Sequence, residues 1–216
     1  MEFLGLTATD FDFFRKKDKM LKDEYEKGRN EVKIHFRGLC YELQKIYHKK
    51  TDGVLEINKE FQNFNKRCVD ILAEFGEKTN MKKKSIEINT ENLCTKLTLE
   101  SHDEENSKCI LDIVKNKKSY IWDYAISDKH NQINCTFKGK SNKVETIKYN
   151  SLDINTKNYD AFIDFIEKNI NSNKHDFEVV IQHTCPKNEA AKQGKNLPNI
   201  IYEDMAGIMD LYNNLI

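Results

Sequence analysis

The sequence predicts an α+β protein with an antiparallel meander sheet of about five to six strands, packed against long N-terminal helices and a C-terminal helix. The period of the apolar residues predicts this class. Apolar residues recur every three to four positions before residue 80 and every second position between 85 and 150. After 156 the helical spacing returns, interrupted by one short apolar run. Helices, then strands, then a helix–strand–helix unit is an order typical of α+β folds. We expect residues 1–216 to form a single domain, with a helical part over 1–80, a sheet over 85–150 and a helix–strand–helix part over 156–216.

The segment TATDFDFFRKKDKM, residues 7–20, predicts a short helix that begins near Thr9. Two Thr–Asp pairs in it have capping-box spacing: Thr7 with Asp10, and Thr9 with Asp12. Phe11 and Phe14 lie three residues apart and should share the inner face, with Phe13 at its margin. The alternative interpretation, an exposed aromatic and basic hook for a partner, requires these phenylalanines to be exposed.

A long helix is predicted over residues 18–49, because its inner positions recur at steps of three and four: Leu21, Tyr25, Gly28, Val32, Phe36, Leu39, Leu43 and Ile46. Gly28 permits close packing there, and the TDG sequence at 51–53 ends the helix. A third helix is expected over 57–75, with Gly76 just beyond its C-terminus. The polar residues 80–84 indicate a loop.

Alternation of apolar and polar residues predicts five short strands, over 93–100, 109–113, 120–126, 133–137 and 144–149. Polar turn-forming segments separate them, which favours a meander with one solvated face. After the sheet we expect a helix over 157–171, a buried strand over 176–182 and a terminal helix over 197–216.

Charge and composition disfavour a dedicated binder of phosphate backbones. The 216 residues carry 35 basic and 35 acidic side chains, so the formal net charge is zero. Four of the basic residues are arginine, the better bidentate reader of phosphates and bases. Nucleic-acid binding would therefore depend on a local patch.

The six cysteines contain no C-x-x-C pair and no zinc-finger spacing, which is typical of reduced core residues. The first residues, MEFLGLTATD, lack the features of a signal peptide, and no stretch approaches the length of a membrane span. We expect a soluble cytoplasmic protein, of bacterial type, without membrane contact.

Motifs for common enzyme classes are missing from the sequence. It contains no G-x-G-x-x-G, no phosphate-binding loop and no H-E-x-x-H, so no cofactor, metal ligand or catalytic residue is assigned. Cys185 and His183 are kept as a hydrolase hypothesis, since both follow a predicted strand. A nuclease core is disfavoured because an offset of three on a strand, as from Asp112 to Lys115 or from Glu145 to Lys148, separates the two side chains onto opposite faces.

The aromatic segment SYIWDYAI, residues 119–126, gives the candidate binding residues: Tyr120, Trp122 and Tyr124, with Lys117 and Lys118 beside them. On a strand the three aromatic side chains share one face. Exposed, that face could stack nucleobases while the lysines contact phosphate. Buried, it is the core face of the sheet.

DFDFF at 10–14 and HFRGLCYEL at 35–43, together with the C-terminal segment 185–215, resemble the two ends of the YktB-like bacterial proteins of unknown function. The centre of the chain departs from that family, so no functional residue is carried over. The Leu-Pro pair at 197–198, followed by Asp204, Leu211 and Tyr212, resembles the closing helix of McrB-type N-terminal DNA-binding domains. That resemblance implies nucleic acid as a partner.

These observations favour a non-enzymatic cytoplasmic binding or regulatory protein. The alternative is a nucleic-acid-binding or processing protein of a bacterial defence or restriction type. A protein partner, a homo-oligomer and nucleic acid are all left open as partners.

Overall fold

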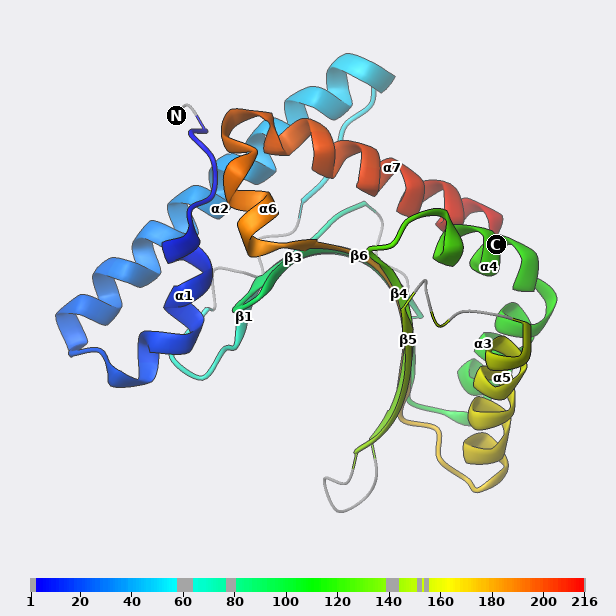
Figure 1. The fold of residues 1–216 in the computed structure, drawn as a ribbon. Helices are drawn as coiled ribbons and strands as arrows, with labels where there is room; N and C mark the ends of the chain where they lie inside the picture. Colours follow the sequence, from blue (N-terminus) through cyan, green and yellow to red (C-terminus); the bar gives the residue numbers. More distant parts are fainter. Residues whose placement is uncertain are drawn as a thin grey trace. The chain divides into compact units, whose positions relative to one another are not determined.

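A computed structural model describes residues 3–57, 64–76, 81–138, 144–150, 153 and 156–215 (Figure 1). The described residues form seven α-helices and a six-stranded antiparallel sheet with the strand order β1-β2-β3-β6-β4-β5. The predicted α+β class is therefore confirmed. The chain divides into two compact units, one of residues 1–77, 85–95 and 184–206, the other of residues 78–84, 96–183 and 207–216.

The first unit begins with two helices that the sequence predicts. Helix α1 spans Ala8–Lys16 with Thr7 as its N-cap, and helix α2 spans Lys22–Thr51 after a 3-10 turn, η1, at Lys17–Lys19. Phe11 and Phe14 are buried as predicted, so the exposed-hook interpretation is wrong. Phe13 is buried too, not marginal, because its ring stacks on Tyr25 at 5.7 Å between centroids.

The C-terminal part of the first unit contains a short helix, α6, at Lys187–Lys192, a 3-10 turn, η3, at Gly194–Asn196, and the first half of α7, which spans Leu197–Asn214. Helix α6 contacts α1. Helix α7 confirms the predicted terminal helix.

The third predicted helix, over 57–75, is wrong where the structure describes it. Residues 58–63 lie outside the described residues, and strand β1 occupies Asp70–Glu74. Ile71 of this strand lies opposite Ile88 in an antiparallel pair with β2. The short run of apolar residues fits either period, and the neighbouring strand supplies the hydrogen bonds that select the extended form.

The predicted loop at 80–84 is also wrong from residue 82 onward, because β2 spans Lys82–Asn89. Lys82 and Lys84 are buried despite their charge. The Nζ atom of Lys82 donates to the carbonyl oxygen of Leu215 at 3.1 Å, and Nζ of Lys84 lies 3.8 Å from the Tyr212 ring centroid. A carbonyl and an aromatic face thus replace water around these ammonium groups.

The second unit contains most of the remaining strands. Strands β3 at Asn92–Ser101, β4 at Asn131–Lys138 and β5 at Val144–Asn150 confirm three strands of the predicted sheet. Strand β6 at Phe177–Pro186 confirms the buried strand predicted over 176–182. The meander order is wrong, however, since β6 enters the sheet between β3 and β4. Local turn signals indicate which segments form strands, but they carry no information about the order of distant strands in the sheet.

Two of the predicted strands, over 109–113 and 120–126, are instead helices α3, Glu104–Asn116, and α4, Lys118–Ser127. The side chain of Asp103 accepts a hydrogen bond from the backbone N–H of Asn106 and caps α3. A run of alternating residues shorter than eight also contains pairs four apart, and these satisfy a helix equally well.

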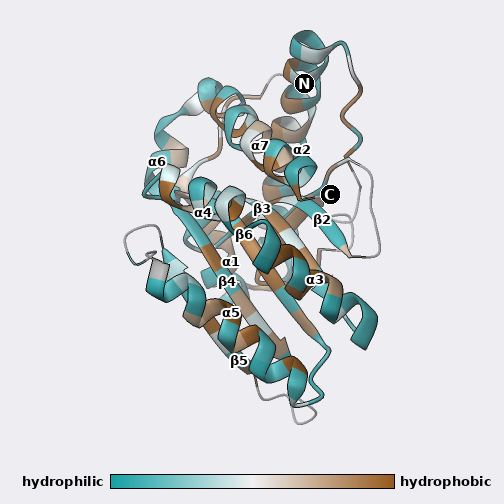
Figure 2. Ribbon diagram, turned by 90° about the vertical axis from the view of Figure 1, so that its right-hand side faces the viewer, coloured by the Kyte–Doolittle hydropathy of each residue, from teal (hydrophilic) through white to brown (hydrophobic). Residues whose placement is uncertain are grey.

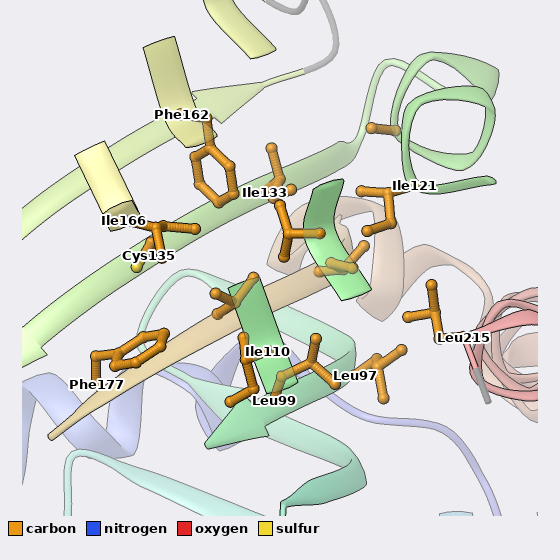
Figure 3. Close-up of a cluster of buried hydrophobic side chains, with 14 of the residues drawn as sticks. Leu97, Leu99, Ile110, Ile121, Ile133, Cys135, Phe162, Ile166, Phe177 and Leu215 are labelled. Atoms are coloured by element: carbon orange, nitrogen blue, oxygen red, sulfur yellow. The ribbon is translucent and has the colours of Figure 1, made fainter. Parts of the chain in front are cut away.

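The core of the second unit combines both kinds of element. Helix α5, Thr156–Asn171, confirms its prediction and carries hydrophilic and hydrophobic residues along its length (Figure 2). Figure 3 shows its Phe162 and Ile166 pointing toward residues of β3, β4, β6, α3 and α4. None of the described helices is both long and apolar enough to cross a lipid bilayer.

Candidate functional site

The candidate site is built on Asp10 in the first turn of α1. One carboxylate oxygen of Asp10, Oδ2, accepts the backbone N–H of Thr7 at 2.7 Å and the Thr7 hydroxyl at 2.9 Å. The capping pattern predicted from Thr7 and Asp10 is therefore present. The Asp10 side chain is held at a fixed place, and the residue is only 2% exposed.

The second oxygen of Asp10 joins α1 to α2. Its Oδ1 lies 2.8 Å from Nδ1 of His35, a residue in the middle of α2. Because a carboxylate only accepts hydrogen bonds, Nδ1 of His35 carries the proton of this bond. The other ring nitrogen, Nε2, makes no hydrogen bond to any described residue, so it is available to a ligand.

A cavity of about 210 Å³ lies between the two helices, which run side by side in Figure 1. Its polar lining consists of Thr7, Thr9, Asp10, Asp12, Lys16, Glu31 and His35. Its apolar lining consists of Phe13, Met20, Gly28 and Val32. We call this space the α1–α2 cleft. It combines fixed polar groups with an apolar wall, as small-molecule sites do.

Gly28 shapes the apolar wall of the cleft. A Cβ atom at this position would lie 2.9 Å from Cδ2 of Phe13, closer than real Cβ contacts allow. Since Phe13 is buried, its ring has little freedom to move away. The close packing that the sequence predicts at Gly28 is confirmed.

The carboxylates of the cleft differ in how far their charge is compensated. Asp12 lies 3.0 Å from Arg15 and 3.3 Å from Lys187. Burial alone would raise the pKa of Asp12, but the Lys187 hydrogen bond and the nearby cations hold that pKa below its ordinary value. Glu31 is exposed and pairs with none of the described residues. It is the cleft's uncompensated carboxylate.

The structure does not bring the predicted aromatic residues to one face. They lie on α4, where Trp122 is turned by about 200° around the helix axis from Tyr120. Tyr120 is 48% exposed, with Nζ of Lys117 at 5.8 Å from its ring. The Trp122 ring instead packs on Tyr159 at 5.9 Å. The predicted strand with three aromatic side chains on one face is therefore wrong. The segment is a helix, and Trp122 points away from Tyr120.

The other two predicted binding residues, Tyr124 and Lys118, make contacts within the fold. Tyr124 packs against the core of the second unit, and a Cβ added at Gly207 would lie 3.4 Å from its ring. Nζ of Lys118 donates to Asp160 at 2.6 Å. A binding role for these residues stays a prediction.

The hydrolase hypothesis rests on Cys185 and His183, and the structure gives the two side chains different environments. Burial raises the pKa of the Cys185 thiol to about 11, so near neutral pH it is protonated and a poor nucleophile. Nε2 of His183 lies 3.7 Å from Asp128, and its ring contacts His130. Two of the nuclease candidates are ion-paired, Lys115 with Glu167 and Glu145 with Lys174.

In the part of the chain that the structure describes, no three His, Cys, Asp or Glu residues are arranged to hold a metal ion. Comparison with models of known protein families gave no match, and neither did a search among curated proteins.

Sequence reasoning missed His35 as a site residue. Asp10 and His35 are 25 positions apart, and no local motif connects them. The usable signals were the capping box at Thr7 and the glycine at 28, which together indicate that α1 packs closely on α2.

Proposed function

We propose that this protein acts by binding and that it recognises a small polar ligand in the α1–α2 cleft. The observation that carries the proposal is the Asp10–His35 pair. A buried carboxylate fixes the imidazole ring at 2.8 Å, and the opposite ring nitrogen is left for a ligand. A preoriented hydrogen-bonding group loses little conformational freedom on binding, which favours affinity.

The hydroxyl groups near the pair favour binding over catalysis. The Thr7 hydroxyl is hydrogen-bonded to Asp10 and also lies 2.8 Å from the Thr9 hydroxyl. Neither hydroxyl is paired with the imidazole, as an activated nucleophile would be. We therefore propose, as the sequence also predicts, that the protein is not an enzyme.

Nuclear magnetic resonance of the histidine side chains tests the proposal. A set of small polar metabolites is added to the protein while the imidazole nitrogens of His35 are observed. We expect at least one compound to shift the His35 signals saturably and to raise the melting temperature. The rise in melting temperature should be lost in His35→Ala, and both effects should be kept in His48→Ala, since His48 lies on the same helix outside the cleft. If every compound leaves the His35 signals and the melting temperature unchanged, the proposal is wrong.

Nucleic-acid binding is the second candidate, favoured by one observation. Tyr120 is half-exposed and has Lys117 beside its ring, which is a minimal stacking and phosphate pair. A mobility-shift assay at low salt, where electrostatic binding is strongest, tests it. Failure to shift single-stranded DNA or RNA there would exclude this candidate.

A cytoplasmic location remains part of the proposal. All six cysteines are free thiols, which supports a reducing compartment.

A further inference from the structure

Two groups on one face of α2 remain available for a ligand in the cleft. Glu31 and His35 are four residues apart, so their side chains are neighbours on the helix surface. Glu31 offers an uncompensated carboxylate, while His35 offers Nε2, which donates a hydrogen bond when the ring is protonated. With His35 in its imidazolium form, the pair presents one acceptor for a cation and one donor for an anion.

The other carboxylates of the cleft already have partners. Asp10 accepts hydrogen bonds from Thr7 and His35, and Asp12 lies within ion-pair distance of Arg15 and Lys187. Lys16 shares the Asp12 carboxylate with these two cations, with its Nζ 3.8 Å from Asp12. A ligand carrying a single charge would leave either Glu31 or His35 unused. A ligand with both charges close together would use both.

The wall beside these groups is apolar. Phe13, Met20 and Val32 line the cleft, and Gly28 keeps the Phe13 ring close against α2. The volume of about 210 Å³ is below the range of roughly 300–1,000 Å³ that is common for drug-sized ligands. The ligand must be compact and must carry a short apolar group.

We propose that the α1–α2 cleft binds an α-amino acid with an aliphatic side chain. Its ammonium group pairs with Glu31, its carboxylate accepts a hydrogen bond from Nε2 of the His35 imidazolium, and its side chain contacts Phe13 and Val32. This inference rests on the proposed function, because it names the ligand class of the same cleft.

The experiment compares L-leucine with its two halves. 3-Methylbutylamine lacks the carboxylate and 4-methylpentanoate lacks the ammonium group, while both keep the aliphatic part. Affinities are measured by titration calorimetry and by the His35 imidazole signals. We expect L-leucine to bind at least tenfold more tightly than either half.

Substitution of Glu31 provides the matched test. Glu31 is exposed, so Glu31→Gln removes the charge without disturbing the core. We expect this change to weaken L-leucine and the amine about tenfold and to leave the carboxylate unaffected. Glu42→Gln, on the same helix outside the cleft, should leave all three affinities unchanged.

The outcomes separate this inference from the proposed function. If the amine or the carboxylate alone binds as tightly as L-leucine, the zwitterion inference is overturned while ligand binding at the cleft stands. The same holds if L-leucine is silent but another polar metabolite shifts the His35 signals. If no compound shifts them, both proposals fall.

Discussion

Nδ1 of His35 lies 2.8 Å from Oδ1 of Asp10, and this hydrogen bond joins the first turn of α1 to the middle of α2. The same carboxylate accepts two hydrogen bonds from Thr7. One buried side chain therefore both caps a helix and orients a histidine, so its removal should affect folding and the cleft together.

Substitution of Asp10 by alanine should destabilise the protein by about 2–3 kcal/mol, because it removes a helix cap and a charge-assisted hydrogen bond. Urea unfolding measures the change. Asp112→Ala is the control, since Asp112 is exposed on α3 and should change stability by less than about 0.5 kcal/mol. Equal effects of the two substitutions would contradict the role given to Asp10.

Two glycine substitutions should change stability in opposite directions. In an open helix, alanine gains about 1 kcal/mol over glycine. At Gly28 the new Cβ would lie 2.9 Å from buried Phe13, so overpacking of about 1–3 kcal/mol should make Gly28→Ala net destabilising. At Gly207 the nearest atom is 3.4 Å away, in Tyr124, so Gly207→Ala should be neutral or stabilising. Thermal unfolding that gave the same sign for both would contradict the close packing of α1 on α2.

Stability should fall in alkaline solution because of buried thiols. A cysteine in the unfolded chain loses its proton near about pH 8.5, whereas burial raises the pKa of Cys40 to about 12. Between these values the folded protein binds more protons than the unfolded chain. The free energy of unfolding should therefore decrease with pH, by up to about 1.4 kcal/mol per pH unit for this thiol.

Urea unfolding at pH 8 and pH 10.5 measures this slope. Cys40→Ala should make it shallower, while Cys109→Ala should leave it unchanged because Cys109 is exposed. An identical slope in the wild type and in Cys40→Ala would show that Cys40 does not carry the effect.

The aromatic residues of α4 should respond unequally to truncation. Trp122 packs on Tyr159, so Trp122→Ala should cost about 2 kcal/mol or more. Tyr120 is 48% exposed, so Tyr120→Ala should stay within about 0.5 kcal/mol. Trp122 is the sole tryptophan of the sequence, so its fluorescence reports the wild-type environment directly. Emission typical of a fully solvated indole would contradict this packing.

The sequence predicts elements well where local chemistry decides them. The capping box at Thr7 and the three-to-four spacing along α2 are local signals, and both helices form. Leu21, predicted as an inner position, is instead the exposed N-cap of α2. Short segments are different. The pattern Cys109–Leu111–Ile113 fits a strand, yet Asp103 caps this segment as a helix in which Ile110 and Val114 are buried. Periodicity over five residues cannot separate the two.

Relationships between distant segments could not be predicted. Nothing local indicates that β6 enters the sheet between β3 and β4, or that Asp10 meets His35. Both depend on how complete elements pack. The candidate site is therefore evident only in the structure, whereas the sequence pointed to Tyr120, Trp122 and Tyr124, of which α4 turns Trp122 away from the two tyrosines.

We infer that the Asp10–His35 pair presents its free ring nitrogen to a small ligand. Long-range nitrogen–proton spectra of the histidine rings test it most directly, during titration with the metabolite set. We predict a proton on Nδ1 of His35 and a saturable shift of its Nε2 signal, with His48 unchanged. A His35 ring with the proton on Nε2 alone, or an Nε2 signal that no compound moves, would contradict the account.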